Sequence, residues 1–218
     1  MDFQAYNLYV SSGNKHKAQE IVEIAEIVFP QTLGKWKIRA PKSAEEVANS
    51  YQGNAQIKML ALAGEIQKET FLPFAVLADD SGLEVSGLDG APGIYSARYA
   101  DPSGKNFDAN IAKVLFELAR FSKNSPQRDG EFRCALSLGF FDRAQDKWNL
   151  LEFSSEGKVS GQIECEVQGH TGFGYDPLFF YPPLKKRFSE MSSYEKNEIS
   201  HRRNAFEAIK IKIRKPHS

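Results

Sequence analysis

Residues 74–83 read Phe-Ala-Val-Leu-Ala-Asp-Asp-Ser-Gly-Leu, and this stretch decides how the chain folds. Five apolar residues in succession, 74–78, predict a strand that is buried on both faces, as in the parallel sheets of α/β proteins. The run stops at Asp79 and Asp80, so we expect the strand to end there and a short strand to follow at 83–85. Carboxylates at the carboxyl end of such a strand lie where open α/β sheets place their ligands.

The segments on either side of this stretch alternate between strand-like and helix-like patterns. Before it, we predict strands at Asn7–Ser11 and 36–40, a first helix that Pro30 ends, and a second helix over 54–68. After it, we predict a helix over 107–121, long strands over 131–141 and 148–160, and a last helix over 198–214. Helices and strands alternate early and strands cluster late, which predicts an α/β protein with a mixed sheet. The polar run 122–130 is the best candidate for a lobe boundary or a hairpin tip.

The size and charge of the chain limit what it can bind. It has 218 residues, more than a usual domain, so we expect one large domain or two tightly joined lobes. Its 28 basic residues balance its 28 acidic residues, so the net charge is zero. A bulk electrostatic attraction to nucleic acid or to an anionic membrane is therefore not expected, and any anion site must come from a few placed side chains.

The sequence predicts a cytoplasmic protein without a membrane anchor. Its first residues lack a basic region followed by an apolar run, which argues against a signal peptide. The longest uncharged apolar run, 71–78, is far shorter than the ~20 residues of a membrane span. The two cysteines, Cys134 and Cys165, are too few for a disulfide scaffold and lack the spacing of a zinc site. We expect both to be buried as small hydrophobic residues.

Residues 12–17, Ser-Gly-Asn-Lys-His-Lys, form the predicted turn from the first strand into the first helix. The start of a helix offers unpaired N–H groups and the positive end of the helix dipole, which suits a phosphate. Asn14 and Lys17 are three residues apart and share a face of the first turn. The alternative is that Ser12 or Asn14 only caps the helix. A Walker loop is absent from the sequence.

The pair Asp79-Asp80 is a candidate magnesium site. Acidic side chains bind Mg²⁺ through oxygen and leave the remaining positions of the ion to water and phosphate. Glu45 and Glu46, in the loop before the second helix, can supply a further ligand. The alternative is a turn stabilised by hydrogen bonds of the aspartate side chains.

Residues 172–177, Gly-Phe-Gly-Tyr-Asp-Pro, suit the binding of a flat ring. The glycines let the backbone approach a ligand, and Phe173 or Tyr175 can stack on a base. Asp176 can accept a proton from a ring N–H group. The alternative is a turn of buried aromatic residues. The GxGxxG fingerprint of dinucleotide-binding folds is absent.

A second group of cations lies near the start of the last predicted helix. Lys196, His201 and Arg202 place hydrogen-bond donors and positive charge within seven residues of one another. Ser200 either caps this helix or lies in its first turn. The alternative is a charged helix face in contact with solvent.

Taken together, the segments offer cations for phosphates, carboxylates for a divalent ion and an aromatic loop for a flat ring, as a nucleoside triphosphate requires. The sequence also resembles the inosine triphosphate pyrophosphatases, a family that hydrolyses non-canonical purine nucleotides. Seven motifs in order carry the resemblance across nearly the whole chain: 12–17, 43–46, 54–58, 78–83, 90–99, 172–177, and 195–196 with 200–202.

The resemblance implies a fold, a reaction and a set of site residues. The fold would be an elongated mixed β-sheet with flanking helices, in two lobes with a central active-site cleft, and the protein would be a homodimer. The reaction would be Mg²⁺-dependent hydrolysis of ITP, dITP and XTP to the monophosphate and pyrophosphate. Asp80 resembles the catalytic carboxylate and a metal ligand, and Glu46 resembles the second metal ligand. The implied substrate contacts are Ser12, Gly13, Asn14, Lys15, His16, Lys17, Lys58 and Ser81 for the triphosphate, and Phe173, Gly174, Tyr175, Asp176, Lys196, His201 and Arg202 for the base and phosphate pocket.

Two departures from the family pattern bear on substrate preference. Gly53 replaces an acidic residue before Asn54, and His170 replaces a glycine in the segment that leads into Gly172.

A donor-only side chain such as Arg202, with His201, would favour the 6-oxo group of hypoxanthine or xanthine over the amino group of adenine. Two alternatives remain open: a house-cleaning pyrophosphatase for modified pyrimidine nucleotides, and a nucleotide-binding module without turnover.

Overall fold

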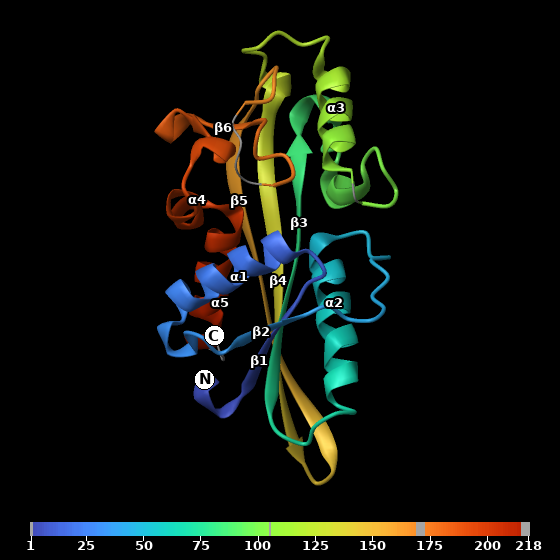
Figure 1. The fold of residues 1–218 in the computed structure, drawn as a ribbon, viewed down its shortest axis with the longest axis vertical. Coiled ribbons are helices and arrows are strands. Elements are labelled where there is room, and N and C mark those ends of the chain that lie inside the picture. Colours follow the sequence, from blue (N-terminus) through green and yellow to red (C-terminus); the bar gives the residue numbers. More distant parts are fainter. Residues whose placement is uncertain (1, 105, 169–172, 215–218) are drawn as a thin grey trace. The chain divides into compact units, whose positions relative to one another are not determined.

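The structure is a computed structural model that describes residues 2–104, 106–168 and 173–214 (Figure 1). Its strands form one seven-stranded sheet in the order β2-β1-β3-β4-β5-β6-β7. β1 pairs in parallel with both β2 and β3, whereas β6 pairs antiparallel with β5 and β7. The sheet is therefore mixed, as predicted. The strands are β1 (Asn7–Ser11), β2 (Trp36–Arg39), β3 (Phe74–Val85), β4 (Asp129–Ala144), β5 (Lys147–Ile163), β6 (Phe179–Tyr181) and β7 (Lys186–Arg187).

Helices flank this sheet and confirm the α/β class. They are α1 (Lys15–Val28), α2 (Tyr51–Ile66), α3 (Phe107–Leu118), α4 (Ser193–Ile199) and α5 (His201–Arg214). Short 3-10 turns lie at Phe3–Ala5, Pro30–Thr32, Ser86–Leu88, Gly93–Arg98, Pro126–Arg128, Pro182–Leu184 and Phe188–Glu190. None of the helices in the described part of the chain is both long and apolar enough to cross a bilayer.

The strand β3 runs further than its sequence suggests. We expected it to end at Asp79, with a second strand at 83–85, but β3 continues without a break from Phe74 to Val85. That prediction was wrong. Both aspartates are buried within the strand: Asp79 is 1% exposed and Asp80 is 5% exposed. The carboxylates stay in the strand because cationic side chains of neighbouring helices neutralise them inside the protein.

The end of the chain contains two helices where one was predicted over 198–214. Ser200 has an extended backbone (φ −67°, ψ 159°) and separates α4 from α5. The second helix also starts earlier than predicted, at Tyr51, because the Ser50 side chain accepts a hydrogen bond from the Gly53 N–H at 3.1 Å and caps it. The hairpin between β4 and β5 turns through Gln145 and Asp146, both with positive φ, as a two-residue hairpin turn requires.

The chain forms two compact units. Unit 1 contains Met1–Asp80, Cys134–Gly157 and Arg202–Ser218, and unit 2 contains Ser81–Arg133 and Lys158–His201. The segment 122–130, which we expected at a lobe boundary or a hairpin tip, lies inside unit 2 and leads from α3 into β4.

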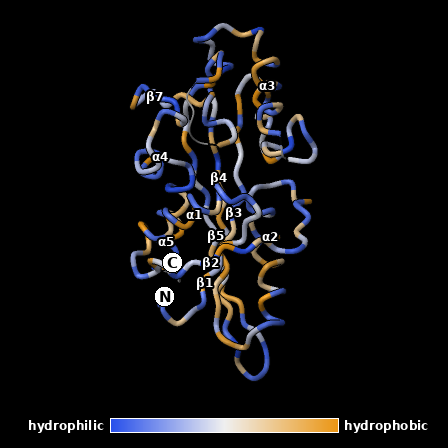
Figure 2. The backbone as a smooth tube through the Cα atoms, in the orientation of Figure 1, coloured by the Kyte–Doolittle hydropathy of each residue, from blue (hydrophilic) through white to orange (hydrophobic). Residues whose placement is uncertain are grey.

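Both faces of the sheet are covered in unit 1. On one face, α1 and α5 pack on alternate residues of β3, Ala75 and Leu77. On the other face, α2 packs on Phe74, Val76 and Ala78. Figure 1 shows α1 and α5 on the opposite side of these strands from α2, and Figure 2 shows the hydrophobic residues of the strands beside α2. The prediction of a strand buried on both faces is therefore confirmed, because successive side chains of a strand point to opposite faces.

In unit 2, a separate core forms around Leu83 and Val85 at the end of β3. The helix α3 contributes Val114 and Leu118 to this core, and Phe132 of β4 and Phe179 of β6 also belong to it. Phe132 lies 4.6 Å from Phe179, measured between ring centroids. Aromatic packing of this kind fixes the short strands and loops that follow β5.

One glycine of β5 allows its neighbour to approach closely, and this gives a test of the packing. A Cβ atom at Gly161 would lie 2.5 Å from the carbonyl oxygen of Phe180. We expect Gly161→Ala to destabilise the protein by about 1–3 kcal/mol through overpacking. Gly64→Ala is the control: it meets no atom within 4 Å and should stabilise α2 by about 0.5–1 kcal/mol. Urea unfolding should shift the two midpoints in opposite directions; equal shifts would contradict the packing described here.

Candidate active site

Asp80 and the residues around it form a candidate site in unit 1. The Asp80 Oδ1 atom accepts a hydrogen bond from Nζ of Lys58 at 2.9 Å, and Oδ2 accepts one from the side-chain amide of Asn54 at 3.2 Å. The same Lys58 nitrogen lies 3.3 Å from Oε1 of Glu46. Asn54 and Lys58 are four residues apart on α2, so they share the face that packs on β3. The two residues predicted to bind the metal therefore meet at one ammonium group.

Lys58 is largely buried, and its carboxylate neighbours raise its pKa. Its side chain is 12% exposed. Burial by itself lowers the pKa of Lys58, but the attraction of Asp80 and of two further carboxylates outweighs burial. The pKa of Lys58 is therefore raised above its usual value, and the side chain remains an ammonium ion at neutral pH.

Glu46 and Asp80 fit a magnesium ion by the chemistry of their donor atoms. Mg²⁺ binds to one or two carboxylates and keeps water and substrate phosphates as its other ligands. The position of Lys58 shows that these two side chains already hold one positive charge between them. No group of three or more His, Cys, Asp or Glu side chains that could hold a metal ion occurs in the described ranges. Glu45, the other candidate ligand, is exposed.

Asp79 belongs to a second cluster, on the opposite face of the sheet. Adjacent residues of a strand point to opposite faces, so Asp79 faces α1 and α5 while Asp80 faces α2. Lys17 Nζ lies 3.0 Å from Oδ1 of Asp79 and 3.5 Å from its carbonyl oxygen. Arg202 places Nε 3.4 Å from Oδ2 of Asp79 and Nη1 3.0 Å from Oε1 of Glu20. The two aspartates therefore do not form one metal site.

Ionisation in this second cluster is set by its own ion pairs. Burial alone would raise the pKa of Asp79, but attraction to Lys17 and Arg202 outweighs burial and lowers it. Cys134 lies directly beside the cluster, with Sγ 3.9 Å from Oδ2 of Asp79. Burial raises the pKa of the Cys134 thiol well above its usual value, so the thiol stays protonated and unreactive.

The start of α1 is compatible with both interpretations of residues 12–17, a phosphate site and a helix cap. The Asn14 side chain accepts a hydrogen bond from the Lys17 N–H at 3.1 Å, so Asn14 is the cap of α1, as one of the alternatives predicted. Ser12 Oγ accepts a hydrogen bond from the Asn14 N–H at 3.3 Å and fixes the turn before the helix. Gly13, Lys15 and His16 are exposed beside this turn. Whether they bind phosphate stays a prediction.

In unit 2, Asp176 organises the aromatic loop. Its Oδ2 atom accepts hydrogen bonds from the Phe173 N–H at 2.9 Å and from Lys196 Nζ at 2.8 Å. The Lys196 nitrogen also lies 4.9 Å from the centroid of the Phe173 ring. Gly174, between these residues, has a φ of 62°, which favours glycine. Residues 173–176 are therefore held by a buried ion pair between Asp176 and Lys196. Gly172 and His170 lie outside the described residues.

The remaining predicted residues of unit 2 differ in exposure. Tyr175 is 3% exposed and donates its hydroxyl to the carbonyl of Ser96 at 2.9 Å, so its ring belongs to the core and only the half-buried Phe173 is placed to stack on a base. His201 stacks on Phe132, with centroids 5.0 Å apart and planes at 14°. Ser81 is half-buried in β3. The alternative of a charged helix face in contact with solvent is wrong for Lys196, His201 and Arg202, which are all buried.

Some functional side chains escaped the sequence analysis, and one prediction about cysteine was wrong. Glu20 was not assigned a role, although a carboxylate between Ala18 and Ile21 on the inward face of α1 is a signal of a buried partner. Asn54 appeared only as part of a motif. Cys165, which we expected to be buried, is exposed because it follows the end of β5 at Ile163.

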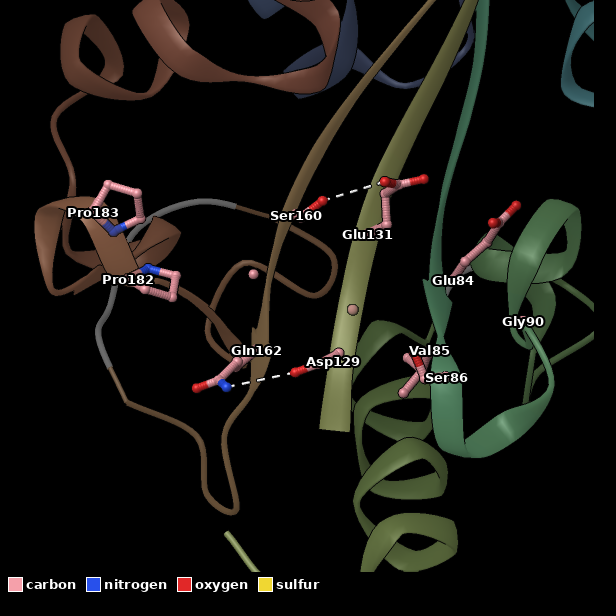
Figure 3. Close-up of a pocket in the computed structure, with 12 residues that line it drawn as sticks. Glu84, Val85, Ser86, Gly90, Asp129, Glu131, Ser160, Gln162, Pro182 and Pro183 are labelled. Carbon is pink, nitrogen blue, oxygen red and sulfur yellow. Dashed lines mark hydrogen bonds between the residues drawn. The ribbon is translucent and has the colours of Figure 1, made fainter. Parts of the chain in front are cut away.

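A separate pocket of about 700 Å³ in unit 2 contains none of the predicted site residues. Figure 3 shows its wall, where Ser160 contacts Glu131 at 3.3 Å and Gln162 contacts Asp129 at 3.5 Å. Glu84 adds a third carboxylate, and no lysine or arginine occurs among the described residues that line the pocket. Arg133 lies 2.9 Å from Glu131 and 3.4 Å from Glu84, and Lys158 lies 3.2 Å from Glu131, so these two carboxylates are already paired with cations.

Comparison with known proteins gives the family of the chain. The sequence model of the Ham1 family matches residues 8–212, which include all the predicted site residues. The chain belongs to the Ham1 family. It is 38% identical over 205 residues to a Ham1-family relative from Clostridium tetani named dITP/XTP pyrophosphatase, with 94% of each chain covered. A protein of the same name from Clostridium perfringens is also 38% identical, over 94% of this chain and 96% of the relative.

The fold agrees as well. The solved structure of the Staphylococcus aureus Ham1 protein matches with a TM-score of 0.72 and 33% identity, covering 96% of this chain and 99% of that chain. A HAM1 protein from Coxiella burnetii matches with a TM-score of 0.71 and 30% identity, covering 96% and 98%. These comparisons confirm two predictions from the sequence: the family of the chain and its mixed α/β fold.

The buried ion pairs of Arg202 give a test of the second cluster. Removing one partner leaves carboxylates buried without compensation, so Arg202→Met should lower the free energy of unfolding by about 3–5 kcal/mol. The adjacent Arg203→Met is the matched control, because its 3.1 Å pair with Glu207 lies nearer the surface and should contribute at most about 1 kcal/mol. Urea unfolding measures both values. Equal losses would show that Arg202 does not hold the cluster together.

Proposed function

We propose that this chain hydrolyses non-canonical purine nucleoside triphosphates, dITP, ITP and XTP, to the monophosphate and pyrophosphate in a Mg²⁺-dependent reaction. The observation that carries the proposal is the convergence of Glu46 and Asp80 on Lys58, in a chain of the Ham1 family. The named relatives, called dITP/XTP pyrophosphatases, supply the substrate class. The purpose of such a reaction is to remove damaged nucleotides from the pool.

The charges of unit 1 suit a triphosphate. A bound nucleoside triphosphate brings about four negative charges, and the leaving pyrophosphate gains more negative charge in the transition state. Lys58 and the N-terminal end of α1 supply positive charge from this chain. Magnesium, when bound to Glu46 and Asp80, adds charge neutralisation and makes a water molecule more acidic.

Asp80 is placed to act as the general base. Its Oδ2 atom is oriented by the amide of Asn54 and its Oδ1 atom by Lys58, so its carboxylate has a fixed direction before substrate arrives. A fixed carboxylate can orient an attacking water and accept its proton. Lys58 stabilises the negative charge that develops on the phosphate oxygens.

Recognition of the base is assigned to unit 2. The half-buried ring of Phe173 offers a stacking surface, and the donors of Lys196 and His201 suit the 6-oxo group of hypoxanthine or xanthine. Adenine would leave such a donor unpaired, at a cost of roughly 1–3 kcal/mol, or about 10- to 100-fold. Arg202, predicted as a base contact, binds Asp79 and Glu20 in this structure, and its contact with the base stays a prediction.

Two expectations about the whole protein accompany the proposal. We propose a cytoplasmic homodimer that works without nucleic acid or a membrane, in keeping with the zero net charge of the chain. Light scattering after size-exclusion chromatography would give the mass directly, and a mass near 24.5 kDa would contradict the dimer.

A panel of nucleotides tests the reaction. With saturating Mg²⁺, dITP, ITP and XTP should release pyrophosphate, and ATP should react at least about 10-fold more slowly. Release of orthophosphate would identify a phosphatase instead. Faster turnover of modified uridine triphosphates would favour the pyrimidine-specific alternative, and no release over hours would favour a binding module.

A substitution at Asp80 tests the general base. Asp80→Asn keeps the shape of the side chain but removes its ability to accept a proton, so kcat should fall at least about 100-fold. Asp142→Asn, an exposed aspartate that accepts a hydrogen bond from Tyr6 at 2.7 Å, is the control and should keep the kcat of the parent. Near-normal kcat in Asp80→Asn would remove Asp80 from this role.

A further inference from the structure

One lysine holds both carboxylates that the proposed function assigns to the metal. Lys58 Nζ lies 2.9 Å from Asp80 Oδ1 and 3.3 Å from Glu46 Oε1, within hydrogen-bond and ion-pair distance of both. Glu46 comes from the loop before α2, Lys58 from α2 itself and Asp80 from β3. Three separate segments therefore meet at a single positive charge.

We propose that Lys58 is a placeholder cation: it holds Glu46 and Asp80 together before the metal arrives and competes with a divalent cation for their oxygens. This inference rests on the proposed function, because that function assigns the metal to these two residues. It adds that Lys58, besides stabilising phosphate charge, sets how tightly the protein binds the free ion.

Electrostatics explains why a placeholder is needed. Two carboxylates near one another in a partly buried setting repel, and an ammonium group between them offsets the repulsion. Lysine suits this task because its ammonium is a compact charge on a flexible stem and can leave without moving the backbone. A divalent ion offers twice the charge of Lys58, but it must first displace Lys58 from at least one oxygen. The apparent affinity for the ion is therefore its intrinsic affinity multiplied by the fraction of time that Lys58 leaves the site open.

The amide of Asn54 holds the Asp80 carboxylate in position when the ammonium group of Lys58 moves away. Its Nδ2 atom donates to Oδ2 of Asp80, not to the Oδ1 atom that Lys58 uses. Ser11 adds a second restraint, because its hydroxyl donates to the backbone carbonyl of Lys58 at 2.9 Å and holds that turn of α2 beside β1. Movement of the Lys58 side chain therefore leaves both the carboxylate and the helix in place.

Lys17 provides a matched comparison. It is also a largely buried lysine, 15% exposed against 12% for Lys58, and it also pairs with an aspartate of β3. Its partner is Asp79, on the opposite face of the sheet from Asp80. Replacing either lysine removes the same charge from the same unit, but only Lys58 touches the proposed metal ligands.

The experiment measures binding of Mn²⁺ alone, without nucleotide, by electron paramagnetic resonance of the free ion. Mn²⁺ is a suitable probe because it prefers the same oxygen ligands as Mg²⁺. We expect Lys58→Met to bind Mn²⁺ at least about 10-fold more tightly than the parent, and Lys17→Met to differ from the parent by less than about 3-fold. If Lys58→Met binds Mn²⁺ and the parent shows no binding, the outcome also supports the placeholder role.

Two outcomes would overturn the placeholder role. Unchanged or weaker binding by Lys58→Met would show that Lys58 does not compete with the ion. Equal tightening by both variants would show an effect of net charge only. Circular dichroism and thermal unfolding check that each variant is folded, and Lys58→Gln, which keeps a hydrogen-bond donor without charge, replaces Lys58→Met if the latter does not fold.

Failure of this inference is distinct from failure of the proposed function. Pyrophosphate release from dITP by the parent protein tests the function and does not depend on the Mn²⁺ affinities of the variants. If the parent releases pyrophosphate and Lys58→Met binds Mn²⁺ no more tightly, only the placeholder role is lost. If the parent releases none, the function is wrong whatever the ion binding shows.

Discussion

The structure of unit 1 depends on the burial of two adjacent carboxylates inside a central strand. Asp79 and Asp80 point to opposite faces of β3, so each needs its own cations, and each face supplies them from a different helix. On one face the ion pairs are balanced and buried, and they join α1 and α5 to the sheet. On the other face Lys58 pairs with two carboxylates, Glu46 and Asp80.

The class of the fold could be predicted from the sequence because hydrophobic patterns are local. The run 74–78 predicted a strand buried on both faces, and the alternation of helix and strand predicted a mixed sheet; both are confirmed. The predicted end of β3 was too early, because charged residues are expected to leave a buried strand unless partners reach them. Those partners come from segments 22 and 62 residues away, which a local pattern does not reveal.

The candidate site was predicted as a set of segments but not as an arrangement. The roles of Asp80 and Glu46 came from family resemblance, and the structure brings the two side chains to one nitrogen atom. The residue pattern alone did not separate Asp79 from Asp80, because the alternation of strand side chains applies only once both residues are known to lie in β3. Tyr175 and Phe173 look equivalent in the sequence. Only Tyr175 is buried in the core, where its hydroxyl donates a hydrogen bond to the carbonyl of Ser96.

The connectivity of the two units restricts how this protein can be divided. The chain passes from one unit to the other after Asp80, Arg133, Gly157 and His201, and the first three of these passages lie inside β3, β4 and β5. A gene fragment that encodes either unit alone would therefore have to cut continuous strands and leave unpaired backbone edges. Recombination could therefore not exchange one unit as a module without cutting these strands.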